Sequence, residues 1–248
     1  MGLAVLCAAL CLSGCSPASE QTFMKPVSIE TVRFFPFQVK GFENTYPKRR
    51  ILVLMPVDAR DFKDIAGVGH EPYQGNPAIG VVLGQTGKID QRLYGPQLVP
   101  LTQRAIAESA REAGMVVSTS ADALDQALRT HVADYVLTSR ITHFWVNKHC
   151  GPDIPAGSTW FTGADVALEV AVYKPPFNVP FWQGDSASAY NDPPLPAAGA
   201  SPEDETEIYD QPGQVLSVAL TRAAAGIFKR DSLHTLIVED STTHAAKP

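Results

Sequence analysis

Stretches of alternating or continuous apolar residues predict the strands of this chain. The segment from Arg50 to Val57 is a nearly continuous apolar run of strand length, which is typical of a buried strand. A long strand is predicted from Asp134 onward, and alternation divides its side chains between two faces. One face would hold Tyr135, Leu137, Ile141 and Trp145, and the other Val136, Phe144 and Val146. Residues 164–173 and 181–190 predict an antiparallel pair of strands joined by a proline-rich connection.

Helical periodicity is present in three segments. Apolar residues recur at steps of three and four from Pro96 to Gly114, where the glycine ends the predicted helix. A short helix is predicted from about Ser120 to Thr130, and a closing helix over residues 214–229. Residues 58–95 are rich in glycine, which predicts a loop or an irregular hairpin with a short strand at 79–83.

This order of elements predicts an α+β fold. We expect a mainly antiparallel sheet with two or three helices packed on one face, in a single domain spanning residues 46–240. Residues 191–213 are rich in proline, alanine and acidic residues, and predict a mobile acidic loop. Residues 241–248 predict a disordered tail.

The composition is that of an ordinary globular protein. The 248 residues are 45% hydrophobic and 19% charged, so neither a disordered chain nor a multi-span membrane protein is expected. Twenty Lys and Arg residues against 26 Asp and Glu residues give a net charge of -6 at pH 7. The broad basic face that nucleic-acid binding requires is therefore not expected, and nucleic acid is excluded as a main partner.

The N-terminal residues predict an export signal. Residues 3–12 form an apolar run that is too short for a membrane-spanning helix of about 20 residues and has the length of a signal-peptide core. Leu12-Ser13-Gly14-Cys15, directly after it, resembles the lipobox of bacterial lipoproteins. The resemblance implies that residues 1–14 are a signal peptide and that the Cys15 thiol carries a diacylglycerol. A second acyl chain, such as palmitate, on the new amine would make the anchor stable.

Residues 15–45 would then be the lipidated cysteine and its tether. In sorted lipoproteins, an Asp after the cysteine usually marks retention in the inner membrane, and here Ser16 stands at that position. We therefore expect anchoring to the periplasmic face of the outer membrane. Cys7 and Cys11 leave with the signal, so Cys150 remains as the thiol of the mature domain and no intramolecular disulfide is expected.

Three further segments fit one template. They are the strand leading to residues 56–60, the helix running into residues 112–117, and the strand at residues 133–141. In this order after a lipobox, they resemble small Gram-negative lipoproteins of the YajG type and the ABC-transport auxiliary type. The domain of those proteins is related to the N-terminal domain of TolB and to the curli-secretion lipoprotein CsgG. The resemblance spans residues 50–238 and implies a binding and assembly module rather than a catalyst.

One departure from the CsgG pattern bears on function. The chain has no second pair of amphipathic strands long enough to build a shared barrel, so a pore is not expected.

No nucleotide is expected either, because Gly87-Lys88 lacks the remaining residues of a P-loop and no G-x-G-x-x-G occurs. Ser158-Thr159 follow a glycine, but they lack the nucleophile elbow of a serine hydrolase.

Metal and carboxylate chemistry are also not indicated. His143 and His149 would lie about 20 Å apart along an extended strand, and His149 with Cys150 supplies only two ligands. Asp165 and Glu169 share a strand face, as two glycosidase carboxylates could, but this spacing is usual for a solvated face. We therefore expect no enzyme activity, no cofactor and no metal.

Aromatic residues gather in the predicted loops and strand ends. Exposed aromatic side chains beside glycine and proline are typical anchors of protein interfaces. The alternative is that these side chains cover the open face of the sheet. The candidate binding residues are Tyr73, Tyr94, Trp160, Phe161, Phe181 and Trp182.

Together these features predict a non-enzymatic lipoprotein, held at the membrane by its lipid and bound to an envelope protein complex through its domain. It would be an accessory subunit of a transport, secretion or cell-wall assembly system. The alternative is a periplasmic carrier that holds a lipid or another apolar ligand between the sheet and its helices. A hydrolase acting on peptidoglycan is a third candidate.

Overall fold

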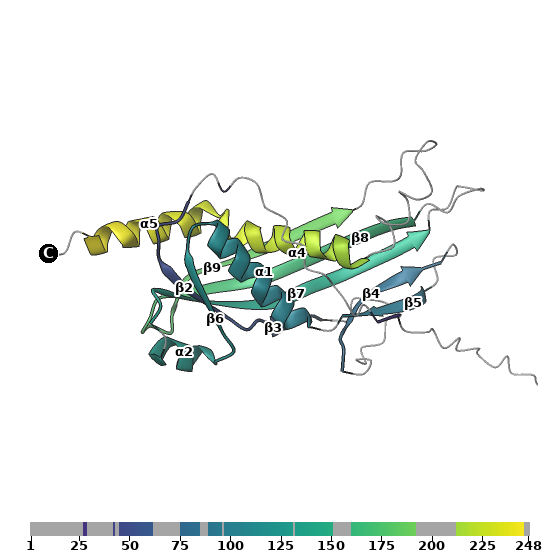
Figure 1. Ribbon diagram of the computed structural model, residues 1–248, viewed down its shortest axis with the longest axis horizontal. Helices are drawn as coiled ribbons and strands as arrows, with labels where there is room; N and C mark the ends of the chain where they lie inside the picture. The colour runs from purple at the N-terminus through teal and green to yellow at the C-terminus, as the bar shows by residue number, and fades with distance from the viewer. Residues whose placement is uncertain are drawn as a thin grey trace, which may run out of the picture.

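The computed structural model has an α+β fold, as predicted (Figure 1). The structure describes residues 27–28, 42, 45–61, 75–84, 89–95, 97–130, 132–150, 160–191 and 212–245. The predicted signal peptide, and most of the tether and the acidic loop, lie outside these residues. The elements are β1 (Val27–Ser28), β2 (Arg50–Leu54), β3 (Val57–Asp58), β4 (Ala78–Leu83), β5 (Ile89–Tyr94), α1 (Leu98–Glu112), β6 (Val116–Ser120), α2 (Leu124–Thr130), β7 (Tyr135–Cys150), β8 (Trp160–Tyr173), β9 (Pro180–Asn191), α4 (Pro212–Phe228) and α5 (Asp231–Ala245). None of the described helices is long and apolar enough to cross a bilayer.

β7 is the strand on which the sheet is assembled. Along one edge it pairs with the antiparallel β8, which pairs in turn with β9. The other edge is shared by three parallel strands in succession: β2 at residues 135–137, β3 at 140–141 and β4 at 146–149. β6 extends the sheet beyond β2, and β5 and β1 extend it beyond β4. Figure 1 shows the consequence, with β2 and β6 at one end of β7 and β4 and β5 at the other.

The long strands pair antiparallel, as predicted, but the sheet as a whole is mixed. The predicted antiparallel pair is confirmed as β8 and β9, and β7 also pairs antiparallel with β8, whereas β2 lies parallel to both of its neighbours, β6 and β7. The helices explain the difference. α1 precedes β6 and α2 precedes β7, and strands connected through such helical crossovers run parallel.

A β-bulge at Thr142 changes which side chains of β7 face the core. Thr142 is an extra residue between Ile141 and His143, which pair with successive residues of β8. Because an extra residue shifts the alternation by one position, even-numbered residues face the core beyond it. The core residues of β7 are Tyr135, Leu137, Ile141, Phe144 and Val146. Trp145 lies on the opposite face, so the predicted assignment of faces is wrong beyond Ile141.

α1 and α4 cover one face of the sheet. Their apolar side chains join those of the strands in one core, in which Ile106, Leu168 and Leu220 are at most 1% exposed. α2 packs on the opposite face, where Leu128 belongs to a separate cluster with residues of β2 and β7. Figure 1 shows α2 on the other side of the sheet from α1 and α4. The prediction of two or three helices on one face is met by α1 and α4, and α2 is an additional helix on the other face.

A fourth helix, α5, extends to Ala245, although the sequence predicted a disordered tail from residue 241. Its Leu233 and Ile237 are fully buried. The Asp240 carboxylate accepts a hydrogen bond from the Tyr135 hydroxyl at 2.7 Å and also pairs with Lys174. Burial, together with the nearby Asp240 carboxylate, raises the pKa of Tyr135 well above its ordinary value. The phenol therefore stays protonated and donates to Asp240.

Arg60 fills the break between β3 and β4 along the edge of β7. Its guanidinium donates to both carboxylate oxygens of Asp58 at 2.8 Å. Nη1 donates to the backbone oxygens of Ala78 and Phe144, at 2.8 and 3.2 Å. These oxygens lie where strand pairing on this edge is interrupted, so the side chain takes the place of ladder hydrogen bonds. The side chain of Arg60 is only 4% exposed.

Replacing Arg60 should weaken the sheet at this break. Arg60→Met keeps the apolar stem but leaves the four acceptor oxygens without the guanidinium, so we expect the free energy of unfolding to fall by about 2–4 kcal/mol. Urea denaturation measures this loss. Arg140→Met is the matched control, because that side chain is 60% exposed and its loss should change stability by less than about 1 kcal/mol. Equal, small losses in both variants would contradict this role of Arg60.

Candidate functional site

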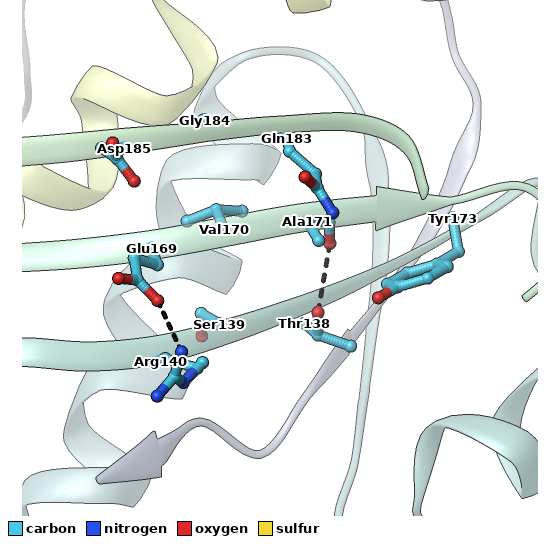
Figure 2. A pocket seen from close by; sticks show the side chains of 10 residues that line it. All are labelled: Thr138, Ser139, Arg140, Glu169, Val170, Ala171, Tyr173, Gln183, Gly184 and Asp185. Atoms are coloured by element: carbon cyan, nitrogen blue, oxygen red, sulfur yellow. Dashed lines mark hydrogen bonds and ion pairs between the residues drawn. The ribbon is translucent and has the colours of Figure 1, made fainter. Parts of the chain in front are cut away.

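An open pocket of about 310 Å³ lies on the face of the sheet opposite α1 and α4 (Figure 2). Residues of the three long strands β7, β8 and β9 form it, so its geometry is fixed by strand pairing rather than by loops. Figure 2 shows the side chains of β7 and β8 meeting in its centre. The lining residues are Thr138, Ser139, Arg140, Glu169, Val170, Ala171, Tyr173, Gln183, Gly184 and Asp185.

Alternation along the strands places polar side chains on this open face. In β8, the even-numbered residues from Ala164 to Val172 are buried, and the odd-numbered residues between them, such as Glu169, face outward. The register then aligns three charged residues in one row across the sheet. Arg140 of β7 pairs with Glu169, and Glu169 pairs with Asp185 of β9.

This row of Arg140, Glu169 and Asp185 carries an unbalanced negative charge. Nη1 of Arg140 lies 2.9 Å from Oε2 of Glu169, but these side chains are 60% and 47% exposed, so the ion pair contributes little to stability. Asp185 stands on the other side of Glu169, and like charges opposite each other on neighbouring strands are unfavourable. A cationic group from a ligand or a partner would relieve this repulsion.

Uncharged polar groups surround the charged row. Thr138 contacts the Ala171 carbonyl with its hydroxyl at 3.4 Å. Figure 2 shows the Tyr173 ring turned from the end of β8 toward Thr138, and Gln183 on the neighbouring strand. The pocket therefore offers hydroxyl, amide, guanidinium and carboxylate groups on a rigid sheet. Such a surface can bind polar groups of a protein or a small molecule.

The described residues show no metal centre. They contain no group of three or more His, Cys, Asp or Glu side chains that could hold an ion. His143 is exposed on the open face, beyond the pocket. The side chains of His149 and Cys150 lie outside the description, so the predicted absence of a metal or cofactor at that end of β7 stays a prediction.

The predicted aromatic binding residues are not brought together in this pocket. Tyr94 and Trp182 are 5% and 8% exposed, so the prediction that they are exposed anchors is wrong. Tyr94 instead packs beside Trp145 on the open face, in agreement with the alternative prediction. Trp182 belongs to the main core and donates from its indole nitrogen to the Ser232 hydroxyl at 3.0 Å. Phe181 is partly buried, with its ring 5.7 Å from that of Tyr135.

Four predicted site residues are not tested by these contacts. Trp160 and Phe161 begin β8, but their side chains lie outside the description. Tyr73 and the lipidation residue Cys15 lie outside the described residues altogether. Their proposed roles in binding and anchoring stay predictions.

The charged row is not predicted from the sequence. The predicted place of Glu169 on a solvated strand face is confirmed, but alternation does not bring Arg140 or Asp185 beside it. The pairing of these residues depends on the register of β7, β8 and β9, which alternation within each strand does not specify. The turn between β8 and β9 was the available signal, because the length of a hairpin connection limits the register of its strands.

Comparisons with known proteins give distant likenesses. No family model matches the chain, and no curated protein matches it significantly. Among solved structures, a DUF330-family protein from Xanthomonas campestris is 14% identical with a TM-score of 0.47, and the match covers 88% of this chain and 99% of that chain. A protein described as a neuraminyllactose-binding hemagglutinin homologue from Helicobacter pylori is 9% identical with a TM-score of 0.41, covering 83% and 96%.

Lipoprotein GNA1162 from Neisseria meningitidis is 12% identical to this chain with a TM-score of 0.32, covering 72% of this chain and 99% of that one. Lipoproteins are thus among the solved structures that this chain resembles. Likenesses this distant identify neither a family nor an activity. The narrower resemblance to YajG-like and CsgG-like proteins stays a prediction from the sequence.

The burial of Trp182 can be tested by truncation. We expect Trp182→Ala to lower the free energy of unfolding by about 3–5 kcal/mol, because it removes a large side chain from the core. Trp182→Phe keeps most of the ring and should be much milder. Phe177→Ala is the matched control, because Phe177 is 65% exposed and its loss should change stability by less than about 1 kcal/mol. Equal effects of Trp182→Ala and Phe177→Ala in chemical denaturation would show that Trp182 is not a core residue.

Proposed function

We propose that this chain is a non-enzymatic accessory lipoprotein of the bacterial cell envelope. The observation that carries the proposal is the lipobox-like sequence Leu12-Ser13-Gly14-Cys15, directly after an apolar run of signal-peptide length. Cys15 would bear the lipid, and Ser16 after it supports anchoring in the periplasmic leaflet of the outer membrane. The domain would then act in the periplasm, as part of a transport, secretion or cell-wall assembly system.

The geometry of the sheet supports a binding role for this domain. α1 and α4 close one face, whereas no described helix covers the part of the other face that carries Arg140, Glu169 and Asp185. A partner could therefore contact several strands at once, on a surface that needs no rearrangement. The unbalanced carboxylate in the charged row favours a partner with basic side chains, because complementary charge directs association.

A carrier of an apolar ligand receives less support. Such a carrier would need space between the sheet and its helices. In that layer, Ile106 of α1, Leu168 of β8 and Leu220 of α4 are at most 1% exposed and belong to one packed cluster. The pocket described above lies on the opposite face and presents mainly polar groups. The accessory role is therefore the function that we propose.

The anchor is tested at Cys15. Protein purified from membranes should begin at Cys15 and have the mass of the chain plus its acyl groups, and Cys15→Ala should lack that mass and no longer fractionate with the outer membrane. Intact mass spectrometry and density-gradient fractionation measure these two properties. Cys150→Ala is the matched control, because it removes a thiol that the lipobox does not contain. An unmodified Cys15, or a Cys15→Ala protein that still fractionates with the outer membrane, would refute the lipid anchor.

The accessory role is tested by recovery of a partner. After crosslinking in intact cells, affinity purification of the full lipoprotein should enrich one envelope protein in stoichiometric amount. Asp185→Arg should lower this recovery at least about tenfold, because it reverses a charge on the open face. Glu112→Arg makes the same change at an exposed position on α1 and should leave recovery unchanged. The accessory role fails if no protein is enriched over the Cys15→Ala protein, or if both charge reversals act alike.

A further inference from the structure

Exposed apolar side chains gather at the end of the sheet where β8 ends, beyond the Tyr173 edge of the pocket. Phe177 and Val179, between β8 and β9, are 65% and 70% exposed, and Val132, between α2 and β7, is 79% exposed. The register places them at the same end, because Val136, near the start of β7, pairs with Tyr173, the last residue of β8. We refer to Val132, Phe177 and Val179 as the apolar tip.

The turn that carries Phe177 and Val179 is rich in proline. Proline and asparagine are common in turns, but the two large apolar side chains between them are not typical turn residues. Here Pro175 and Pro176 precede Phe177, whose backbone N–H donates to the Lys174 carbonyl at 2.9 Å, and Pro180 begins β9. The prolines restrict the backbone, so Phe177 and Val179 are presented to solvent with little conformational entropy left to lose on binding.

Basic side chains outnumber acidic ones among the described residues of this end, although the chain as a whole has a net charge of -6. β2 begins level with β7, so the residues directly before it lie beside the tip end of the sheet. Lys48 and Arg129 are exposed there, at the start of β2 and the end of α2. Among the described residues, the basic ones of this end are Lys48, Arg49, Arg50, Arg111, Arg129 and Lys174, and the acidic ones are Glu112, Asp125, Asp134, Glu239 and Asp240. Two of the acidic groups, Asp134 and Asp240, are already paired with Arg50 and Lys174.

We propose that the apolar tip contacts an anionic lipid surface. Phe177 and Val179 would enter the headgroup region, and the basic side chains around them would face lipid phosphates, which is the arrangement that interfacial proteins use. The inference rests on the proposed function, because the lipid on Cys15 would hold the domain beside a bilayer.

The length of the chain permits this contact. β1 pairs with β5, β5 pairs with β4, and β4 pairs with β7 from Val146 onward. The tip lies at the other end of β7, so it is about 40 Å from β1 at about 3.3 Å per residue. From Cys15 to Val27 the chain can reach about 40 Å when extended. A domain lying along the bilayer can therefore place its tip on the surface while its anchor stays inserted.

The test uses the full lipoprotein reconstituted in vesicles of phosphatidylglycerol and phosphatidylethanolamine with brominated acyl chains. Phe177→Trp should add a blue-shifted tryptophan emission that the bromolipids quench, above the signal of the native tryptophans. Val57→Trp is the matched control, because Val57 is 58% exposed on β3 but pairs with Arg140, away from the tip. Its added emission should stay unquenched.

Charge is tested in the same sample. Joint replacement of Lys48→Gln and Arg129→Gln should lower the ratio of tip-bound to tip-free protein by about tenfold, and Arg104→Gln on α1 should leave this ratio unchanged. Raised salt should act like the double replacement.

Equal quenching at positions 177 and 57, or none at position 177, would overturn the proposal and leave a protein surface as the occupant of the tip. Intact mass of the same sample reports the acyl chains on Cys15 independently. Missing acyl chains would show that the lipid anchor fails, whereas missing quenching at position 177 would show that the tip does not contact lipid. The two failures are therefore distinguished in one sample.

Discussion

The division of one edge of β7 among β2, β3 and β4 determines the rest of the structure. The break in that edge coincides with the bulge at Thr142, and the Arg60 guanidinium satisfies backbone oxygens there. The bulge returns Phe144 and Val146 to the face that already holds the apolar residues of the first half of β7. α1 and α4 can therefore cover one continuous apolar face, and no described helix covers the pocket on the opposite face of β7, β8 and β9.

Local patterns predicted most elements but not how they pair. The periodicities of α1, α2 and α4 and the alternation of β8 lie within single elements, so the sequence predicts them directly. The parallel pairing of β2 with β6 and β7 depends on how the chain crosses between strands, which no single element specifies. The bulge at Thr142 lies where β7 changes its partner from β3 to β4, so it also depends on pairing. α5 was missed because it has little amphipathic contrast, and Asp240 and the buried Leu233 and Ile237 hold it by tertiary contacts.

The same distinction applies to the candidate site. Trp182 resembles an interface anchor in the sequence, but its place in β9 turns it toward the helices, where Ser232 accepts its N–H. Glu169 reads as an ordinary solvated residue, and only the register shows that it stands between Arg140 and Asp185. The open face thus follows from strand pairing, whereas the proposed lipid anchor rests on the N-terminal sequence alone. We propose from the two together an envelope protein that is held at a membrane and binds a partner through its sheet.

The central claim is that the open face of the sheet, and not the face covered by helices, contacts a partner in the cell. The most direct measurement places a photo-crosslinking amino acid at Gln183, which lines the pocket, and separately at Arg222, which is exposed on α4. After irradiation of intact cells, we expect a discrete crosslinked product from position 183 and none from position 222. No product from position 183, or the same product from both positions, would contradict it.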